Sequence, residues 1–162
     1  MKTIPQRSAD DVETILHHYG DLLYRLCYIL LKNESDAEGA VQETIIRYYQ
    51  KAPYFENSSH EKAWLIRVAT NKSRDILRFR KRHPQLDPAA SEFLSYESAD
   101  SGILDALTAL PEKSRLVLTL YYVEEYRIDE IAKIIGRTSS AVKMRLKRGR
   151  ELLEEIYRKE YL

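Results

Sequence analysis

Apolar residues recur at helical spacing along the first half of the chain and predict three helices there. The first begins at Asp10 or Asp11, the second begins at Ser35, and the third begins near Ser58, after Pro53 has ended the second. The residues expected to face the core are Ile15, Leu22, Leu23, Leu26, Ile29 and Leu30, then Ala37, Val41, Ile45 and Tyr48, then Leu65, Val68, Ala69, Ile76 and Phe79. Residues 1–82 are therefore predicted to form one helical domain.

The second and third predicted helices each begin with the sequence pattern of a capping box. Ser35 is followed by Glu38, and Ser58 is followed by Glu61. In this motif each side chain accepts a hydrogen bond from the free backbone N–H of the other residue. The pattern places both helix starts at serine residues and leaves residues 54–59 as the loop that leads into the third helix.

The third predicted helix has two chemically different faces. At 100° per residue its apolar residues fall on one side. Arg67, Asn71, Arg74 and Arg78 cluster on roughly the opposite side. One face is therefore expected to pack against the domain core, while the other presents a basic stripe to solvent.

A change in composition separates this domain from a second one. Residues 83–102 include Pro84 and Pro88 and show no clear helical period, which is typical of a linker. Residues 83–110 carry five acidic residues and no Lys or Arg. Residues 103–162 are predicted to form a second helical domain, with Pro111 as the first residue of a helix. Its expected core stripe is Leu116, Val117, Leu120 and Tyr121.

Residues 128–153 have the pattern of a helix-turn-helix. A short helix with Ile131, Ala132 and Ile135 facing inward is followed by Gly136 as the turn residue. Thr138 or Ser139 then caps a second helix. The residues of this second helix that project to its buried side are Val142, Leu146, Gly149, Leu153 and Ile156.

The outward face of that second helix is basic. The residues expected to contact DNA are Ser139, Ser140, Lys143, Met144, Arg145, Lys147 and Arg148. Arg and Lys donate to guanine edges and to phosphates, and small residues allow close approach to the groove. A solvated basic helix end is the alternative interpretation, because cations favour the C-terminal end of a helix. The turn, the cap and the absence of acidic residues over 131–150 favour DNA binding.

Composition and charge narrow the class of protein further. The 162 residues include 26 Lys or Arg and 25 Asp or Glu, so the formal net charge is only +1. Residues 62–82 nevertheless carry eight basic residues and one acid, and residues 137–150 carry six basic residues and no acid.

The single cysteine, Cys27, excludes an internal disulfide and lies in an apolar run. No apolar run reaches the ~18 to 20 residues that span a bilayer, so we expect a cytoplasmic protein.

Catalysis finds little support in the sequence. The adjacent His17 and His18 lie about 100° apart on a helix and do not form the i, i+4 pair that favours a metal site. His60 and His83 stand alone, and the sequence has no Gly-rich phosphate loop or nucleophile motif. We therefore expect no enzymatic activity, no metal and no cofactor.

Several motifs in a fixed order carry a family resemblance over nearly the whole chain. The segments are Asp36-Ala37-Glu38, Val41-Gln42-Glu43-Thr44, residues 63–71, Leu110-Pro111, Glu130-Ile131-Ala132 and residues 141–146. Together they resemble the extracytoplasmic-function (group 4) sigma factors of the sigma-70 family. The resemblance implies a region 2 domain at 1–82, a linker at 83–102 and a region 4 domain at 103–162. It also implies a subunit that directs bacterial core RNA polymerase to promoter DNA and initiates transcription.

The resemblance assigns roles to three sets of residues. The helix-turn-helix would bind the minus-thirty-five element of the promoter. The polymerase-binding residues would be Asp36, Glu38, Gln42 and Glu43, beside Gly39 where the family usually has an acid. The residues that hold the opened minus-ten strand would be Arg67, Asn71, Arg74 and Arg78, and the residues around a flipped base would be Tyr54, Phe55 and Asn57. Trp64 is expected to lie in the core rather than to stack on a base.

The resemblance also implies partners and leaves alternatives. Factors of this kind are commonly held inactive by an anti-sigma factor, and their acidic linker threads the polymerase channels that later hold RNA.

The closest alternative to a sigma factor is a stand-alone helix-turn-helix repressor or activator, which needs no polymerase. The second basic helix argues against it. A protein-binding helical adaptor is disfavoured by the acid-free second helix of the helix-turn-helix.

Overall fold

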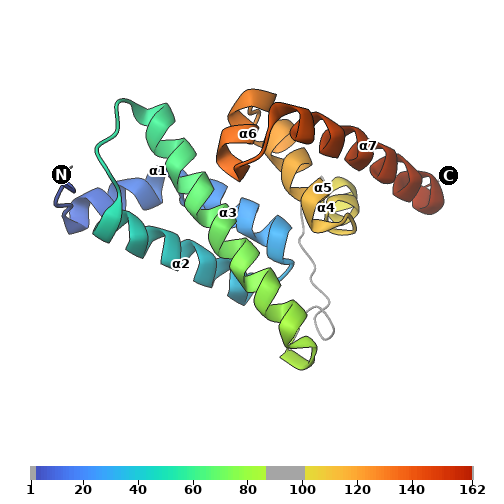
Figure 1. Cartoon of the computed structure of the whole chain (residues 1–162). Coiled ribbons are helices and arrows are strands. Elements are labelled where there is room, and N and C mark those ends of the chain that lie inside the picture. Colours follow the sequence, from blue (N-terminus) through green and yellow to red (C-terminus); the bar gives the residue numbers. More distant parts are fainter. Residues whose placement is uncertain (1–2, 87–100, 162) are drawn as a thin grey trace. The chain divides into compact units, whose positions relative to one another are not determined.

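Helices form every regular element in the part of the chain that the structure describes. The structure is a computed structural model, and it describes residues 3–86 and 101–161. In chain order the elements are α1 (Ala9–Leu31), α2 (Glu34–Lys51), α3 (Ser58–Arg82), the 3-10 turn η1 (Pro84–Leu86), α4 (Ser101–Thr108), α5 (Glu112–Leu118), the π-helix η3 (Thr119–Val123), α6 (Ile128–Ile135) and α7 (Ser139–Tyr161) (Figure 1).

The chain divides into two compact units between residues 92 and 93. We call these the N-terminal unit and the C-terminal unit. The prediction of two small helical domains is confirmed. The limits of the linker at 83–102 stay a prediction, since most of that segment lies outside the described residues.

The N-terminal unit is a bundle in which α1, α2 and α3 all pack against one another. Its centre is an apolar stripe on α1, where Leu23, Leu26, Ile29 and Leu31 are fully buried. Burial of such side chains contributes about 1.5 to 3 kcal/mol each to stability. Cys27 lies in the same stripe and is fully buried, as the sequence predicted.

The start of α1, at Ala9, lies one to two residues earlier than predicted. Ser8 is the N-cap, and its side chain accepts a hydrogen bond from the backbone N–H of Asp11. The Asp11 carboxylate in turn accepts from the Ser8 backbone N–H at 2.8 Å. Ser8 and Asp11 therefore form a capping box at the start of α1. The apolar pattern did not predict this box, because both residues precede Ile15, the first apolar residue of the predicted stripe.

The predicted serine caps of α2 and α3 are wrong, because an asparagine precedes each helix. Asn33 Oδ1 accepts from the backbone N–H of Asp36 at 2.8 Å, and Asn57 Oδ1 accepts from that of His60 at 2.9 Å. Asparagine is as good an N-cap as serine. Ser35 and Ser58 consequently lie in the first turns of their helices.

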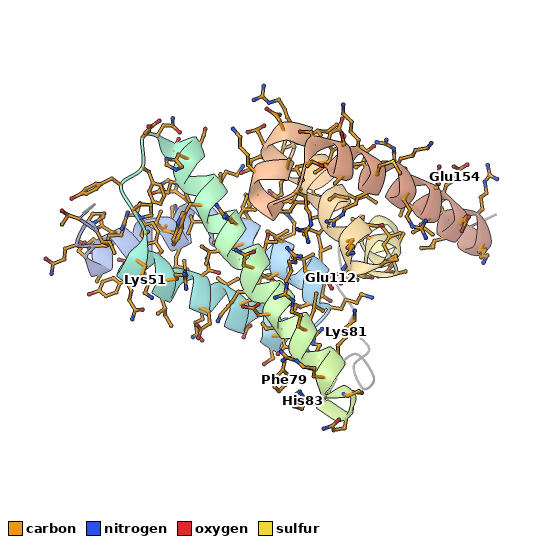
Figure 2. All side chains as sticks on the ribbon, in the orientation of Figure 1. Lys51, Phe79, Lys81, His83, Glu112 and Glu154 are labelled. Carbon is orange, nitrogen blue, oxygen red and sulfur yellow. The ribbon has the colours of Figure 1, made fainter. Side chains whose placement is uncertain are left out.

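The inner face of α3 also differs from the prediction near its end. Phe79 is 48% exposed and stacks on His83, with ring centres 4.2 Å apart, at the end of α3 (Figure 2). Arg80 is buried instead, because the surface beneath it is the polar connection between α1 and α2. Its guanidinium donates to the Leu31 carbonyl at 2.6 Å and to the Asp36 carboxylate at 2.5 Å. Elsewhere in the N-terminal unit, four other predicted core positions are only half-buried: Leu22, Val41, Val68 and Ile76.

The C-terminal unit packs α5 and α6 against α7. Pro111 is the N-cap of α5 rather than its first residue, and its carbonyl accepts from the Arg115 N–H at 2.9 Å. The segment 114–120 is buried throughout, and Tyr121 after it is half-buried. Gly149 allows α5 and α7 to approach closely, since a Cβ there would lie only 3.0 Å from Leu118 Cδ1.

Among the residues that the structure describes, no helix combines the length and the apolar character needed to cross a bilayer.

Candidate functional site

The helix-turn-helix predicted at 128–153 forms from α6 and α7. Gly136 ends α6 in the left-handed conformation, with φ 68°, which an L residue adopts only with strain. Of the two predicted caps, Thr138 is the one used: its Oγ1 accepts from the Ala141 N–H at 3.1 Å. Val142 and Leu146 then anchor α7 in the core. These local features fix which side of α7 faces outward.

The outward face of α7 is exposed and cationic. Five of the predicted contact residues are exposed polar or basic side chains: Ser139, Ser140, Lys143, Lys147 and Arg148. Met144 is 68% exposed, and Arg145 on the flank is half-buried. Within the described ranges Lys143, Lys147 and Arg148 form no ion pair, so their charges are free to meet an anionic partner.

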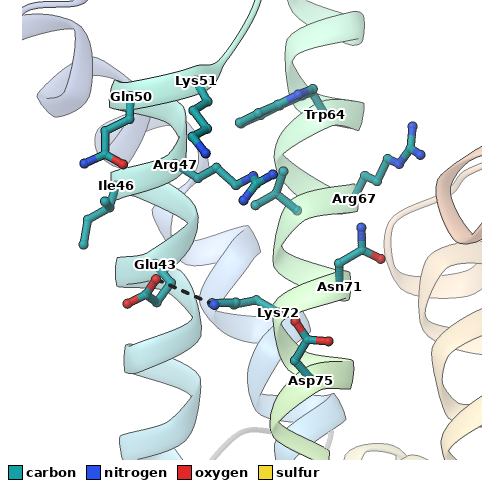
Figure 3. Close-up of a pocket in the computed structure, with 11 residues that line it drawn as sticks. Glu43, Ile46, Arg47, Gln50, Lys51, Trp64, Arg67, Asn71, Lys72 and Asp75 are labelled. Carbon is teal, nitrogen blue, oxygen red and sulfur yellow. Dashed lines mark ion pairs between the residues drawn. The ribbon is translucent and has the colours of Figure 1, made fainter.

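A second cationic surface lies in the N-terminal unit, in a groove of about 540 Å³ between α2 and α3 (Figure 3). Of the predicted minus-ten residues, Arg67 and Asn71 line this groove and are exposed. Arg78 is exposed nearby and pairs with Asp75 at 3.3 Å. Arg74 is half-buried and lies outside the groove lining.

The groove contains basic residues that sequence reasoning missed. Arg47 and Lys51 extend from α2 toward α3 (Figure 3), and neither forms an ion pair within the described residues. Lys72 is also present, but Glu43 lies 3.8 Å from its Nζ. The i, i+4 spacing of Arg47 and Lys51 was a signal that the two share one helix face.

The three loop residues predicted to surround a flipped base, between α2 and α3, differ in exposure and in the contacts they already make. Tyr54 is 69% exposed. Phe55 is half-buried among Tyr48, His60 and Trp64, with ring centres 6.4, 5.3 and 5.9 Å away respectively. The Asn57 side-chain oxygen is occupied as the cap of α3.

Trp64 joins this aromatic cluster and also lines the α2–α3 groove. It is half-buried, so it belongs to the packing of the loop more than to the fully buried core. Burial raises the pKa of Tyr48 at the base of the cluster, and hydrogen bonding to Arg7 acts in the opposite direction.

The predicted polymerase-binding residues on α2 fall into two groups. Glu38, Gln42 and Glu43 are exposed. Asp36 is instead paired with the buried Arg80 and has a side chain 34% exposed. A small apolar groove of about 250 Å³ adjoins the exposed group, with Leu16, Val41 and Ile46 among the residues that line it beside Glu38 and Gln42.

Gly39 faces open space on the same helix, because a Cβ there would have no heavy atom within 4 Å. Among the described residues no group of three or more His, Cys, Asp or Glu side chains is placed to hold a metal ion.

The fold and these surfaces define a helix-turn-helix protein that has one basic surface on α7 and a second, the α2–α3 groove, in the helical bundle of the N-terminal unit. The family model "Sigma-70 region 2" matches residues 15–83, and the model "Sigma-70, region 4" matches residues 101–153. The chain is 33% identical to the ECF RNA polymerase sigma factor SigW of Bacillus subtilis, over 98% of this chain and 95% of the relative. It is 31% identical to RNA polymerase sigma factor SigV of the same organism, over 93% of each chain.

The chain therefore belongs to the extracytoplasmic-function sigma factors of the sigma-70 family, and it is an RNA polymerase sigma factor.

Solved structures agree with this assignment of the fold. The sigma factor RpoE of Bartonella quintana, in complex with the anti-sigma factor NepR, matches with a TM-score of 0.75 and 26% identity, over 94% of this chain and 99% of that one. CnrH in complex with the cytosolic domain of CnrY matches with a TM-score of 0.70 and 23% identity, over 94% and 91%.

Proposed function

We propose that the two cationic surfaces divide promoter recognition between the two units. The observation that carries this proposal is the exposed, acid-free face of α7 in the same chain as the open basic groove between α2 and α3. Duplex DNA presents base edges in a major groove wide enough for a helix, whereas an opened strand presents unstacked bases and phosphates. The two surfaces match these two forms of DNA.

In the C-terminal unit, α7 is the helix that enters the major groove of the minus-thirty-five element. The contact residues are Ser139, Ser140, Lys143, Met144, Arg145, Lys147 and Arg148. Arg148 and Lys147 supply hydrogen bonds to base edges or phosphates, and the serines near the helix start allow close approach. The left-handed Gly136 and the Thr138 cap support this role, because they orient the start of α7.

In the N-terminal unit, the α2–α3 groove holds the opened minus-ten strand. Arg67 and Asn71 contact the strand within the groove, Arg74 and Arg78 contact it from α3 beyond the groove lining, and we add Arg47 and Lys51 from α2 as phosphate contacts. At the loop, the exposed Tyr54 is the side chain available for stacking on a flipped base, while Phe55 forms the inner wall. Asn57 has its amide nitrogen left for the base, since its oxygen caps α3.

Glu38, Gln42 and Glu43 form the polar part of the polymerase-binding surface, and the adjoining apolar groove supplies its apolar part. Asp36 contributes indirectly. Its ion pair with Arg80 ties the start of α2 to the end of α3, and this supports the orientation of the exposed residues on α2.

An anti-sigma factor is the partner that would control this chain. The sigma factor RpoE of Bartonella quintana, whose fold this chain shares, is in complex with the anti-sigma factor NepR, and this supports a partner of the same kind here. We further propose that the chain acts in the cytoplasm, where transcription takes place, and that it has no catalytic activity of its own.

Transcription with purified components tests the proposal. The chain is mixed with sigma-free bacterial core polymerase and a genomic DNA library, and the transcript starts are mapped. Sequence-specific starts that require both proteins are expected. If a competent core gives no specific start while the chain alone shifts a specific duplex, the stand-alone regulator is the better account.

A further inference from the structure

Arg7, in the segment that precedes α1, joins the N-terminus to the loop between α2 and α3. Its Nη1 donates to the Ala52 carbonyl at 2.5 Å, and its Nη2 donates to the Pro53 carbonyl at 2.7 Å. The guanidinium carbon also lies 4.5 Å from the ring centre of Tyr48 and 5.5 Å from that of Phe55. One side chain therefore contacts the end of α2, the loop backbone and two aromatic rings of the cluster around Phe55.

These contacts use properties that only arginine combines. Its planar fork donates two hydrogen bonds to neighbouring acceptors while its face lies against an aromatic ring. A lysine ammonium is a compact charge on a flexible stem, so it cannot hold two carbonyl oxygens and lie flat on two rings at once. Beyond the residues that Arg7 contacts, the loop is exposed at Tyr54 and Glu56, and Pro53 itself is also exposed.

We propose that Arg7 is a positioning residue for capture of the flipped minus-ten base. It holds residues 52–57 and the Phe55 ring in one arrangement, so that the loop is ordered before the base arrives. Ordering a loop in advance removes an entropic cost from binding. The inference rests on the proposed function, in which Tyr54 and Phe55 form the pocket wall.

The contacts of Arg7 with the loop are tested on the free full-length chain through the fluorescence of Trp64. This residue is the only tryptophan in the sequence, and its ring centre lies 5.9 Å from that of Phe55. Acrylamide quenching of Trp64 fluorescence is measured for the wild type, Arg7→Ala, Arg7→Lys and the control Arg158→Ala. Arg158 is an exposed arginine that pairs with Glu154 on α7, far from the loop in sequence. Both Arg7 variants are expected to increase quenching, and the control is expected to leave it unchanged.

The consequence for DNA is tested with the same proteins bound to core polymerase. The probe is a fork-shaped promoter DNA, chosen by the start mapping above, with 2-aminopurine at each minus-ten adenine in turn. A captured base gives a fluorescence increase when it leaves the stack. Both Arg7 variants are expected to weaken this capture by roughly three- to tenfold, with unchanged affinity for the duplex upstream element.

Three results would overturn the proposal: wild-type quenching in Arg7→Ala, wild-type base capture in a variant whose quenching has risen, or wild-type behaviour of Arg7→Lys. The last would mean that any cation at position 7 suffices, so that the two-carbonyl contact of the arginine fork is not what orders the loop. Failure of the proposed function looks different, because the wild-type complex itself would then capture no base. In that case the base-capture role of Arg7 falls with it, whatever the Trp64 measurement shows.

Discussion

At the scale of single residues, burial determines the chemistry of Cys27. The side chain is fully buried in the apolar stripe of α1, and this burial raises the pKa of its thiol from 9.0 to about 11. The thiolate is the reactive form, so Cys27 is expected to be inert in the folded protein at neutral pH. Its role is therefore in packing.

The raised pKa of Cys27 predicts a loss of stability at alkaline pH. The folded protein holds the thiol proton more tightly than the unfolded chain, so this contribution is fully present below pH 9.0 and is lost as pH rises to about 11. Urea unfolding at pH 8 and at pH 10.5 measures it, with Cys27→Ala as the control that lacks the thiol. The stability advantage of the wild type over Cys27→Ala should shrink by about 1 to 2 kcal/mol at the higher pH. An advantage that stays constant would contradict the assignment.

Arg148 provides the residue-scale prediction for DNA. It is exposed on the outward face of α7 and forms no ion pair within the described residues, so its charge is available to an anionic partner. Arg148→Ala should weaken binding of the polymerase complex to the upstream element by roughly 1 to 3 kcal/mol if the contact is bidentate to a base. Competition binding with single-base changes in that element measures the loss. An unchanged preference at every position would remove Arg148 from the recognition surface.

At the scale of elements, glycine positions distinguish close packing from open surface. Gly149 lies where α7 meets α5, and a Cβ there would also lie 3.3 Å from Ser114 Cβ. Gly39 on α2 has no neighbour in the way. Adding a side chain should therefore have opposite effects on stability at the two positions.

We predict that Gly149→Val destabilises the C-terminal unit by about 2 kcal/mol, because the branched side chain overpacks against the fully buried Leu118. Gly39→Ala should stabilise the N-terminal unit by up to about 1 kcal/mol, through helix propensity alone. Unfolding followed by circular dichroism reports both units, and Trp64 fluorescence reports the N-terminal unit by itself. Full stability of Gly149→Val would show that α5 and α7 do not pack as closely as described.

The helix-turn-helix was predictable from sequence because its signals are local. The turn at Gly136, the cap at Thr138 and the apolar positions of α7 act within a few residues of one another. The caps of α2 and α3 were misplaced for a similar reason, since serine and asparagine offer the same chemistry at neighbouring positions. Sequence pattern alone cannot choose between them.

The parts of the site that sequence reasoning missed depend on tertiary contacts. Arg47 and Lys51 become part of a groove only when α3 packs beside α2. Arg7 contacts carbonyl groups 45 and 46 residues further along the chain. The pairing of Asp36 with the buried Arg80 likewise joins residues 44 apart, and it separates Asp36 from the exposed residues with which the motif had grouped it.

At the scale of the whole molecule, a small net charge conceals two strongly basic surfaces. The net charge of +1 arises because acidic residues elsewhere offset the basic blocks. Each block lies in its own compact unit, so one chain carries a surface for duplex DNA and another for an opened strand. This arrangement suits a subunit that must first locate a promoter and then help to open it.

The most direct test of this division compares strand opening by polymerase complexes that carry the wild-type chain, Asn71→Ala or Arg148→Ala on one promoter. Permanganate reactivity of minus-ten thymines measures opening, and protection of the upstream element measures binding. We predict that Asn71→Ala protects the upstream element normally but leaves the thymines unreactive, whereas Arg148→Ala loses upstream protection. Normal opening by Asn71→Ala would contradict the claim that the N-terminal unit holds the opened strand.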